Sequence, residues 1–258
     1  MKRQLLKKNA KILKNAAYPV AVIAIVLIAW YFAAIAADSE FILPEPVATL
    51  RALTALLGEP GFWTAFGATV LRAIAAFISS LAAALVLALV SRFFKPLESL
   101  LSPLVSVLRA LPTMAVVLLL IVWAGARKAP VIVAVMVLLP TLYAAFTEAL
   151  GNVNRDVIDM AKIDGASRLT LALRFYLPLA APLASRSTAA CVSLGLKLTV
   201  AAEVLASTAK SIGMMMQLAR IYFDVAGLIA LTVLTVIAAL VLEKLVYALL
   251  SLSFRSWI

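Results

Sequence analysis

The sequence predicts an all-α, polytopic membrane protein with six transmembrane helices in one membrane domain. Hydrophobic residues make up 65% of the 258-residue chain and charged residues only 14%, whereas soluble domains are roughly 45–50% apolar. So little polar surface cannot cover a soluble globule of this size. The apolar residues also gather into blocks of about twenty, which is the length that a helix needs to cross a bilayer.

Six apolar blocks define the expected spans, and the polar gaps between them define the loops. The second block is rich in alanine and serine, small residues that allow membrane helices to approach closely. Pro112 in the third block and Pro140 in the fourth are expected to kink their helices. The blocks cover residues 18–37, 65–90, 104–124, 131–150, 183–205 and 226–250.

The amino-terminal part begins with a basic segment, residues 1–17, and the membrane domain covers residues 18–258. A basic segment before an apolar block is also the pattern of a secretory signal. The block 18–37 is longer than the ~7–15 apolar residues of signal cores, so an uncleaved first helix is favoured and a cleaved signal is the alternative. The following outside loop is expected to contain a short surface helix over 46–58, which starts at a proline.

The basic residues between the blocks predict the orientation of the chain. Fourteen of them fall in gaps assigned to the inside and five in gaps assigned to the outside, so both termini are predicted to be cytoplasmic. The adjacent Arg127 and Lys128 oppose this rule in a tight outside turn, residues 125–130. Because the cations are dispersed between apolar blocks, the sequence does not indicate a nucleic-acid partner. The outside basic residues are Arg51, Arg127, Lys128, Lys210 and Arg220.

The longest segment of mixed polarity is the loop 154–178, between the fourth and fifth blocks. Asn154 is a good N-cap for a short helix over 157–164. Gly165 is expected to end that helix, because glycine readily adopts the left-handed conformation of a C-cap. Four residues are spaced to share one face of the helix: Val157, Met160, Ala161 and Asp164.

A second helix is expected to begin in the same loop after Ala166 and Ser167. Its apolar residues follow at spacings of four and three. Pro178 is expected to end or kink it as the chain re-enters the membrane. The loop would therefore form a compact protrusion of two helices.

The spacing of residues in this loop resembles the cytoplasmic EAA loop of ABC importer permeases. Asp159-Met160-Ala161 occupies the acidic–small–alanine triplet, and Gly165 follows after three residues. Phe175 and Leu177-Pro178 complete the pattern. The departures are aspartate for glutamate and Met160 for alanine. The resemblance implies a coupling helix that sits in a groove of a separate ATPase subunit; an ordinary loop packed on its own bundle is the alternative.

This resemblance implies the six-helix fold of a type I importer permease in the bacterial inner membrane. The implied partners are two ABC ATPase subunits, a second permease copy in a homodimer and an extracytoplasmic solute-binding protein. The chain itself would bind no cofactor, and ATP and Mg would be held by the ATPase. The residues implied in ATPase coupling are Asp159, Met160, Ala161, Asp164, Gly165, Ala166, Ser167 and Pro178.

Further motifs resemble the nitrate/sulfonate/taurine-type subgroup of these permeases, whose members carry small anions or vitamin precursors. They are Thr69-x-x-Arg72, Arg109-Ala-Leu-Pro112, Ala202-Glu203 and Ser211-Ile-Gly213. The turn after Trp123 is shorter than is usual in that group, which is the main departure from its pattern. The chain lacks the Gly-x-x-x-x-Gly-Lys-Ser/Thr phosphate loop, so it cannot hydrolyse ATP by that route.

Arg72 and Glu203 are the candidate residues of a translocation path. A charge within a membrane span is costly and usually faces a cavity or a partner. Glu203 is either a gate residue or an interfacial carboxylate bonded to nearby backbone, and Arg72 is either a path residue or a structural anchor. An ATP-independent secondary transporter or channel is the rival function. A membrane enzyme is disfavoured, because histidine is absent and no catalytic constellation is found.

Overall fold

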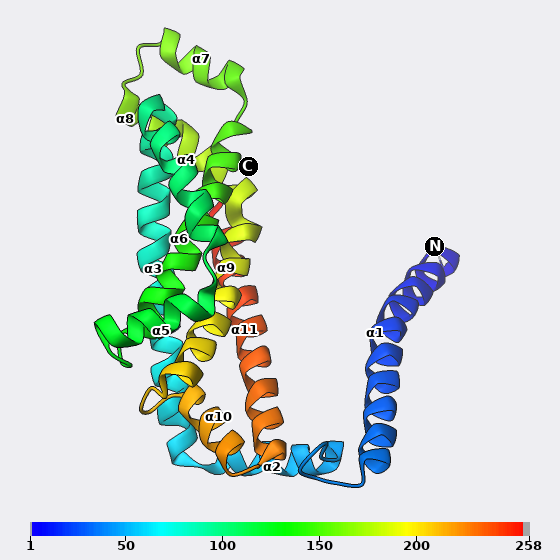
Figure 1. The fold of residues 1–258 in the computed structure, drawn as a ribbon. Coiled ribbons are helices and arrows are strands. Elements are labelled where there is room, and N and C mark those ends of the chain that lie inside the picture. Colours follow the sequence, from blue (N-terminus) through cyan, green and yellow to red (C-terminus); the bar gives the residue numbers. More distant parts are fainter. Residues whose placement is uncertain (1, 255–258) are drawn as a thin grey trace. The chain divides into compact units, whose positions relative to one another are not determined.

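The computed structural model describes the backbone of residues 2–254 and the side chains of residue 18 and residues 21–252 (Figure 1). Every described element is a helix, which confirms the all-α expectation. The chain divides into two units, one formed by residues 1–59 and 218–232 and the other by residues 60–217 and 233–258. The elements are α1 (Lys2–Ala37), α2 (Pro46–Gly58), α3 (Pro60–Phe93), α4 (Lys95–Ala110), α5 (Thr113–Ala124), α6 (Ala129–Gly151), α7 (Arg155–Ile163), α8 (Arg168–Thr170), the π-helix η1 (Leu171–Tyr176), α9 (Leu177–Ala206), α10 (Ile212–Ile221) and α11 (Val225–Phe254).

In the first unit, the predicted short helix is confirmed as α2. Glu45 is extended, with φ −63° and ψ 151°, and Pro46 starts the helix. This is the position where a proline ring has the required φ and its missing N–H is not needed. The indole of Trp30 in α1 donates to the Pro44 carbonyl oxygen over 3.1 Å, which ties the end of α1 to the chain entering α2. The basic side chains expected before residue 18 lie outside the described residues.

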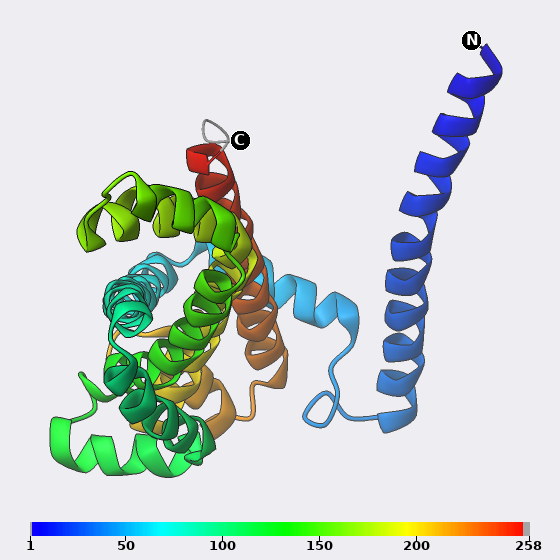
Figure 2. The same ribbon diagram turned by 90° about the horizontal axis from the view of Figure 1, so that it is seen from above.

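The second unit is built on three long helices, α3, α6 and α9, which pack pairwise against one another. Ala84 and Ala88 of α3 are buried in the same hydrophobic core as Leu138 and Leu142 of α6. The small residues predicted to allow close packing in the second block therefore lie in the core. Figures 1 and 2 show α7 lying across one end of this unit, crosswise to α3.

Among the described residues, four helical stretches are long and apolar enough to cross a membrane. They are Pro60–Phe93, Ala129–Gly151, Arg168–Ala206 and Val225–Leu252. A fifth is counted if the bent pair α4 and α5 is one span. The described apolar part of α1, Ala21–Ala37, is shorter than a full span. The described residues therefore contain four or five candidate spans, and the count of six remains a prediction.

The third expected span, residues 104–124, is wrong as a single helix. α4 ends at Ala110 and α5 starts at Thr113, and the two axes differ by 94°. Leu111 is extended and Pro112 precedes the first turn of α5. A residue before proline avoids the helical region, and proline has no N–H to continue the hydrogen-bond ladder. The expected kink is therefore a complete break.

The expectation that Pro178 ends the second helix of the loop is also wrong, and the alternative of a kink remains a prediction. The chain is helical from Arg168 to Ala206, and Pro178 lies in the first turn of α9. The turn before it is the π-helix η1, in which the Leu177 N–H donates to the Ala172 carbonyl. A wider turn accommodates a proline ring that would otherwise clash with the carbonyl four residues earlier.

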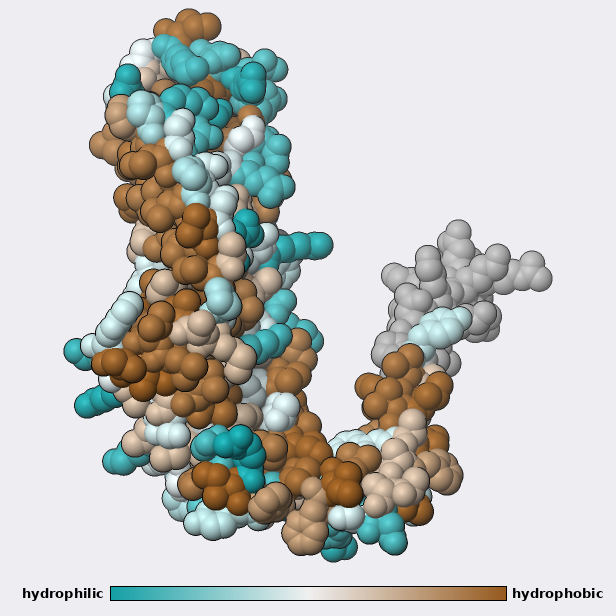
Figure 3. All heavy atoms as spheres, viewed as in Figure 1, coloured by the Kyte–Doolittle hydropathy of each residue, from teal (hydrophilic) through white to brown (hydrophobic). Residues whose placement is uncertain are grey.

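The surface of the second unit changes in polarity along its helices. Hydrophilic side chains gather around α7, and hydrophobic side chains cover much of the neighbouring helix surface (Figure 3). Exposed apolar residues include Leu118 and Val122 of α5 and Leu71 of α3. Exposed apolar side chains on long helices are expected where the surrounding solvent is lipid.

Candidate functional site

The loop segment, residues 154–178, starts with a helix whose two ends are closed by local hydrogen bonds. The Asn154 side chain accepts from the Asp156 N–H at 2.9 Å, as an N-cap does. At the other end Gly165 has φ +79°, and the Gly165 and Ala166 N–H groups donate to carbonyls of the last turn, each at 3.0 Å. This is a Schellman motif with glycine at the left-handed position. The predicted C-cap at Gly165 is confirmed.

The second helix of the segment has its own cap. The Ser167 hydroxyl accepts from the Thr170 N–H at 3.2 Å, so the expected restart after Ala166-Ser167 is confirmed. Tyr176, in η1, is buried. Its ring meets Phe93 edge-to-face at 5.7 Å and lies 5.2 Å from the Arg92 guanidinium carbon. These contacts fix the segment to the end of α3.

The faces of α7 differ from the expected pattern. Ile158 and Ala161 are buried in the core of the second unit, whereas Met160 is 66% exposed and Ile163 is 85% exposed. The expectation that Met160 and Ala161 share one face is therefore wrong. Ala161 packs α7 onto its own bundle, and Met160 and Ile163 point outward.

The charged residues of α7 lie on its surface. Lys162 and Asp159 form an exposed ion pair at 2.7 Å, and Asp164 is exposed at the helix end. A pair of this kind, three residues apart on a helix, contributes only about 0.3–0.5 kcal/mol. The outward surface of α7 is thus a small apolar patch beside accessible charges.

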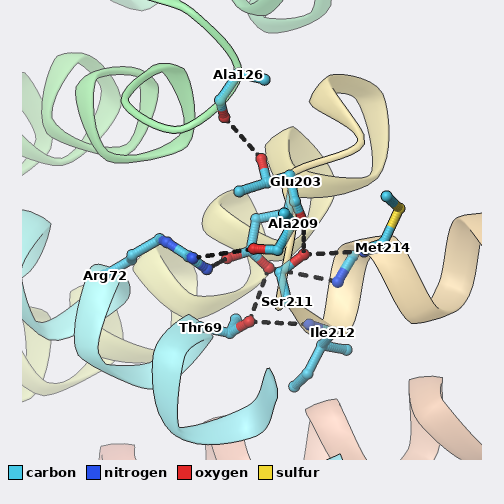
Figure 4. Close-up of polar contacts among 10 residues, drawn as sticks. Thr69, Arg72, Ala126, Glu203, Ala209, Ser211, Ile212 and Met214 are labelled. Atoms are coloured by element: carbon cyan, nitrogen blue, oxygen red, sulfur yellow. Dashed lines mark hydrogen bonds and ion pairs between the residues drawn. The ribbon is translucent and has the colours of Figure 1, made fainter. Parts of the chain in front are cut away.

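A second group of candidate residues meets around the buried carboxylate of Glu203, near the end of α9. The Arg72 Nη1 atom donates to Glu203 Oε1 at 2.6 Å (Figure 4). The Glu203 side chain is fully buried, and that of Arg72 is 18% exposed. The structure therefore brings together the two residues that the sequence suggested for a translocation path. A buried ion pair in this position joins α3 to α9.

The remaining contacts of the carboxylate come from Thr69 and α10. The Thr69 hydroxyl donates to Glu203 Oε2 at 2.9 Å and accepts from the Ile212 N–H at 3.0 Å. The Gly213 N–H donates to the same carboxylate oxygen at 3.4 Å. We call Thr69, Arg72, Glu203, Ile212 and Gly213 the Glu203 cluster. It ties three helices together with one charge pair and a shared hydroxyl.

Gly213 allows α10 to approach α9 closely. A Cβ atom at this position would lie 2.3 Å from the Glu203 Cβ and 2.5 Å from the Val204 backbone nitrogen. Both are impossible contacts, and the second is with backbone that cannot rotate away. The close packing of α10 against α9 therefore explains why this position of the Ser211-Ile-Gly213 motif is a glycine.

The turn between α9 and α10 completes this region. The Ser211 hydroxyl accepts from the Met214 N–H at 2.9 Å, so it caps α10. Thr208 donates to the Ala126 carbonyl at 2.8 Å and thereby reaches the loop before α6. In addition, Arg72 Nη2 donates to the Ala209 carbonyl at 3.4 Å. The polar groups of the turn are thus joined to α3 and to the loop 125–128.

The chemistry available to the Glu203 cluster is structural and electrostatic. Its acid is already neutralised by Arg72, and the cluster contains no paired nucleophile and base. Among the residues with described placement, no group of three histidine, cysteine or acidic side chains could hold a metal ion. The arrangement is suited to holding helix ends together, and to releasing them if the pair separates.

Sequence reasoning missed the partner of each residue in this cluster. Thr69, Arg72, Glu203 and Gly213 stand in three separate motifs of the sequence, and no motif pairs Glu203 with a base. Arg72, the base that Glu203 meets, lies 131 residues away in sequence. The available signal was the presence of one acid and one base near the same expected end of two different spans.

Comparisons with known proteins agree with this architecture. The chain is 28% identical over 222 residues to a probable ABC transporter permease protein of Brucella melitensis, covering 85% of this chain and 88% of the relative. It is 30% identical over 129 residues to the riboflavin transport system permease protein RibX of Chloroflexus aurantiacus, which covers 50% of this chain and 48% of the relative.

A solved structure shares the fold. It is that of a bacterial alginate ABC transporter in complex with an alginate pentasaccharide-bound periplasmic protein, with a TM-score of 0.64, 14% sequence identity and coverage of 93% of this chain and 96% of that chain. The family described as the binding-protein-dependent transport system inner membrane component matches residues 80–256, which is more than half of the chain. The chain therefore belongs to this family of ABC transporter permeases, which are multi-pass membrane transport subunits and not themselves enzymes.

Proposed function

We propose that this chain is the permease subunit of an ATP-driven importer and that α7 is its coupling helix to separate ATPase subunits. The observation that carries the proposal is the geometry of α7. Local caps and the buried residues Ile158 and Ala161 fix the helix to the bundle, while Met160 and Ile163 remain outward. A rigid protrusion with an uncovered apolar patch can receive force from a partner and transmit it to α6 and α9.

The proposed assembly contains two ATPase subunits, a second permease copy and an extracytoplasmic binding protein. The alginate transporter with its periplasmic protein supports a binding-protein partner, because it shares this fold. One bundle provides only half of the wall of a path, so a homodimer is proposed. Both termini and α7 would be cytoplasmic, and ATP and Mg would be bound by the ATPase. ATP binding would then shift the bundle between inward-open and outward-open states.

We assign the solute to the class of small anions or vitamin precursors. Three of the four nitrate/sulfonate/taurine-type motifs contribute residues to the Glu203 cluster. The similarity to a riboflavin transport permease favours a vitamin-related solute within this class. Measuring which compounds raise the melting temperature of the cognate binding protein would decide the solute.

Cross-linking tests the docking of α7. The chain contains one cysteine, Cys191, which is buried and can be replaced by serine. An Ile163→Cys variant that carries a thiol-attached photo-cross-linker should capture the ATPase subunit. The control is Trp123→Cys, because Trp123 is also well exposed, at 74%, and belongs to α5. Capture of the ATPase by both positions, or by neither, would contradict the proposed docking.

A glycine substitution tests whether the shape of the segment matters for transport. In Gly165→Val, a β-branched side chain is forced into a left-handed conformation, which costs non-glycine residues about 1–2 kcal/mol, although no heavy atom lies within 4 Å of the new Cβ. The Schellman motif should open, and uptake should fall at least tenfold while membrane insertion is kept. Gly151→Val is the control, because that site is also open but has no positive φ. Normal uptake by Gly165→Val, or uptake by the chain without an ATPase in liposomes, would refute the coupling role.

A further inference from the structure

A cavity of about 610 Å³ lies between α3 and the start of α6 in the second unit. One part of its wall is apolar and the other part is cationic, and no lining residue is a carboxylate. The apolar residues are Ala68, Leu71, Val131 and Ile132, and the cationic residues are Arg72, Arg127 and Lys128. We call this space the basic-rimmed cavity.

Two of the three cations are available for a ligand. Arg72 is engaged by Glu203, whereas Arg127 and Lys128 are exposed. The ion pairs found among the described residues do not include either of them. They also immediately precede α6, whose amino-terminal end is the positive end of the helix dipole and favours negative charge. The rim is therefore complementary to an anion.

The position of the rim explains which anion fits. α6 is long and apolar enough to cross the bilayer, and Arg127 and Lys128 stand before its first residue, at the end opposite to α7. Cations that directly precede a membrane-spanning helix are expected at the level of the lipid headgroups, and Val131 and Ile132 follow within the next turn of the helix. The distribution of basic residues in the other loops does not account for an exposed basic pair at this end, and binding of a local anion would account for it.

We propose that the basic-rimmed cavity binds an anionic phospholipid of the leaflet facing away from α7. Arg127 and Lys128 contact the phosphodiester headgroup, and Leu71, Val131 and Ile132 contact the first part of an acyl chain. A phospholipid matches both halves of the wall, since its charge and its apolar chain are joined in one molecule. A small free anion would contact only the cationic rim, and the apolar wall would stay exposed to water. The inference does not depend on the solute or on the ATPase.

Lipid retention tests this proposal. The permease, purified with the subunits that accompany it, is placed in nanodiscs of phosphatidylcholine with a minor fraction of phosphatidylglycerol, and the lipids bound to the released complex are counted by native mass spectrometry. Two interfacial charges contribute enough for Arg127→Gln/Lys128→Gln to lower the preference for phosphatidylglycerol roughly 30-fold. The charge-conserving Arg127→Lys/Lys128→Arg should keep most of the preference. Arg220→Gln, which removes another exposed cation, is the matched control.

Each outcome decides the proposal. The proposal of a defined lipid site is supported if the preference for phosphatidylglycerol is lost in the double glutamine variant and kept in the other two variants, with an unchanged elution volume. An unchanged preference in that variant overturns it. An equal loss in Arg220→Gln would show general surface attraction and would also overturn it. Displacement of the lipid by free glycerol phosphate or sulfate would assign the rim to a soluble anion and overturn the lipid as occupant.

Discussion

The buried ion pair between Arg72 and Glu203 is expected to contribute strongly to the free energy of unfolding. The Glu203 side chain is fully buried, and its partner is 18% exposed, at an N–O distance of 2.6 Å. Removing one partner of a buried pair costs about 3–5 kcal/mol, because the remaining charge is left unpaired. Since Thr69 and Gly213 still donate to the Glu203 carboxylate, we expect Arg72→Gln to cost about 3 kcal/mol, at the lower end of that range.

The carboxylate is easier to replace than the arginine. In Glu203→Gln the amide keeps an oxygen for the Thr69 hydroxyl and leaves Arg72 with access to solvent, so a loss of about 1–2 kcal/mol is expected. The double variant should be less destabilised than the sum of the single variants by about 2 kcal/mol, which is the coupling energy of the pair. The assay is unfolding in mixed micelles of increasing SDS content, followed by tryptophan fluorescence.

The surface pair Asp159–Lys162 is a control with nearly the same geometry. Its N–O distance is 2.7 Å, but its side chains are 62% and 56% exposed. The same double-mutant cycle on this pair should give about 0.3–0.5 kcal/mol. A coupling energy for Arg72 and Glu203 that is no larger than this control would refute the argument that burial makes the pair hold α3 and α9 together.

Three further substitutions test the packing of the second unit, each by the same unfolding assay. Gly213→Ala should destabilise by about 1–3 kcal/mol, because its methyl group meets Glu203 and backbone; an unchanged midpoint would show that α10 moves freely. Leu138 is fully buried, so Leu138→Ala should cost about 2–5 kcal/mol, and a loss below 1 kcal/mol would mean that the core refills the space. Tyr143→Phe removes the 3.1 Å hydrogen bond to the Ser91 hydroxyl and should cost about 0.5–1.5 kcal/mol; a stabilised variant would contradict a net contribution from this bond.

Local chemistry explains why parts of the fold could be predicted from the sequence. The apolar blocks correspond to helices because backbone groups in lipid must be paired within the segment. Pro46 and Gly165 define helix ends through φ preferences that belong to single residues. The loop pattern around Gly165 was sufficient to predict a short capped helix, which the structure contains as α7.

Other features depended on partners that lie far away in the sequence. The break between α4 and α5 and the π turn before Pro178 show that proline marks a disturbance without specifying its form. A proline can end a helix, as at Pro112, or be absorbed by a wider turn, as at Pro178. Neighbouring packing selects between these outcomes. The orientation of Ala161 was missed for a similar reason, since helical spacing defines faces but not which face meets the bundle.

The sequence alone determined that this is a helical membrane protein with a capped polar loop, because hydrophobicity and φ preference act over a few residues. Only the tertiary structure decided that Arg72 reaches Glu203 and that Gly213 must lack a side chain. Those contacts form between residues brought together by the packing of α3, α9 and α10. Their free energy comes from desolvation and close approach, and neither exists until the helices are assembled.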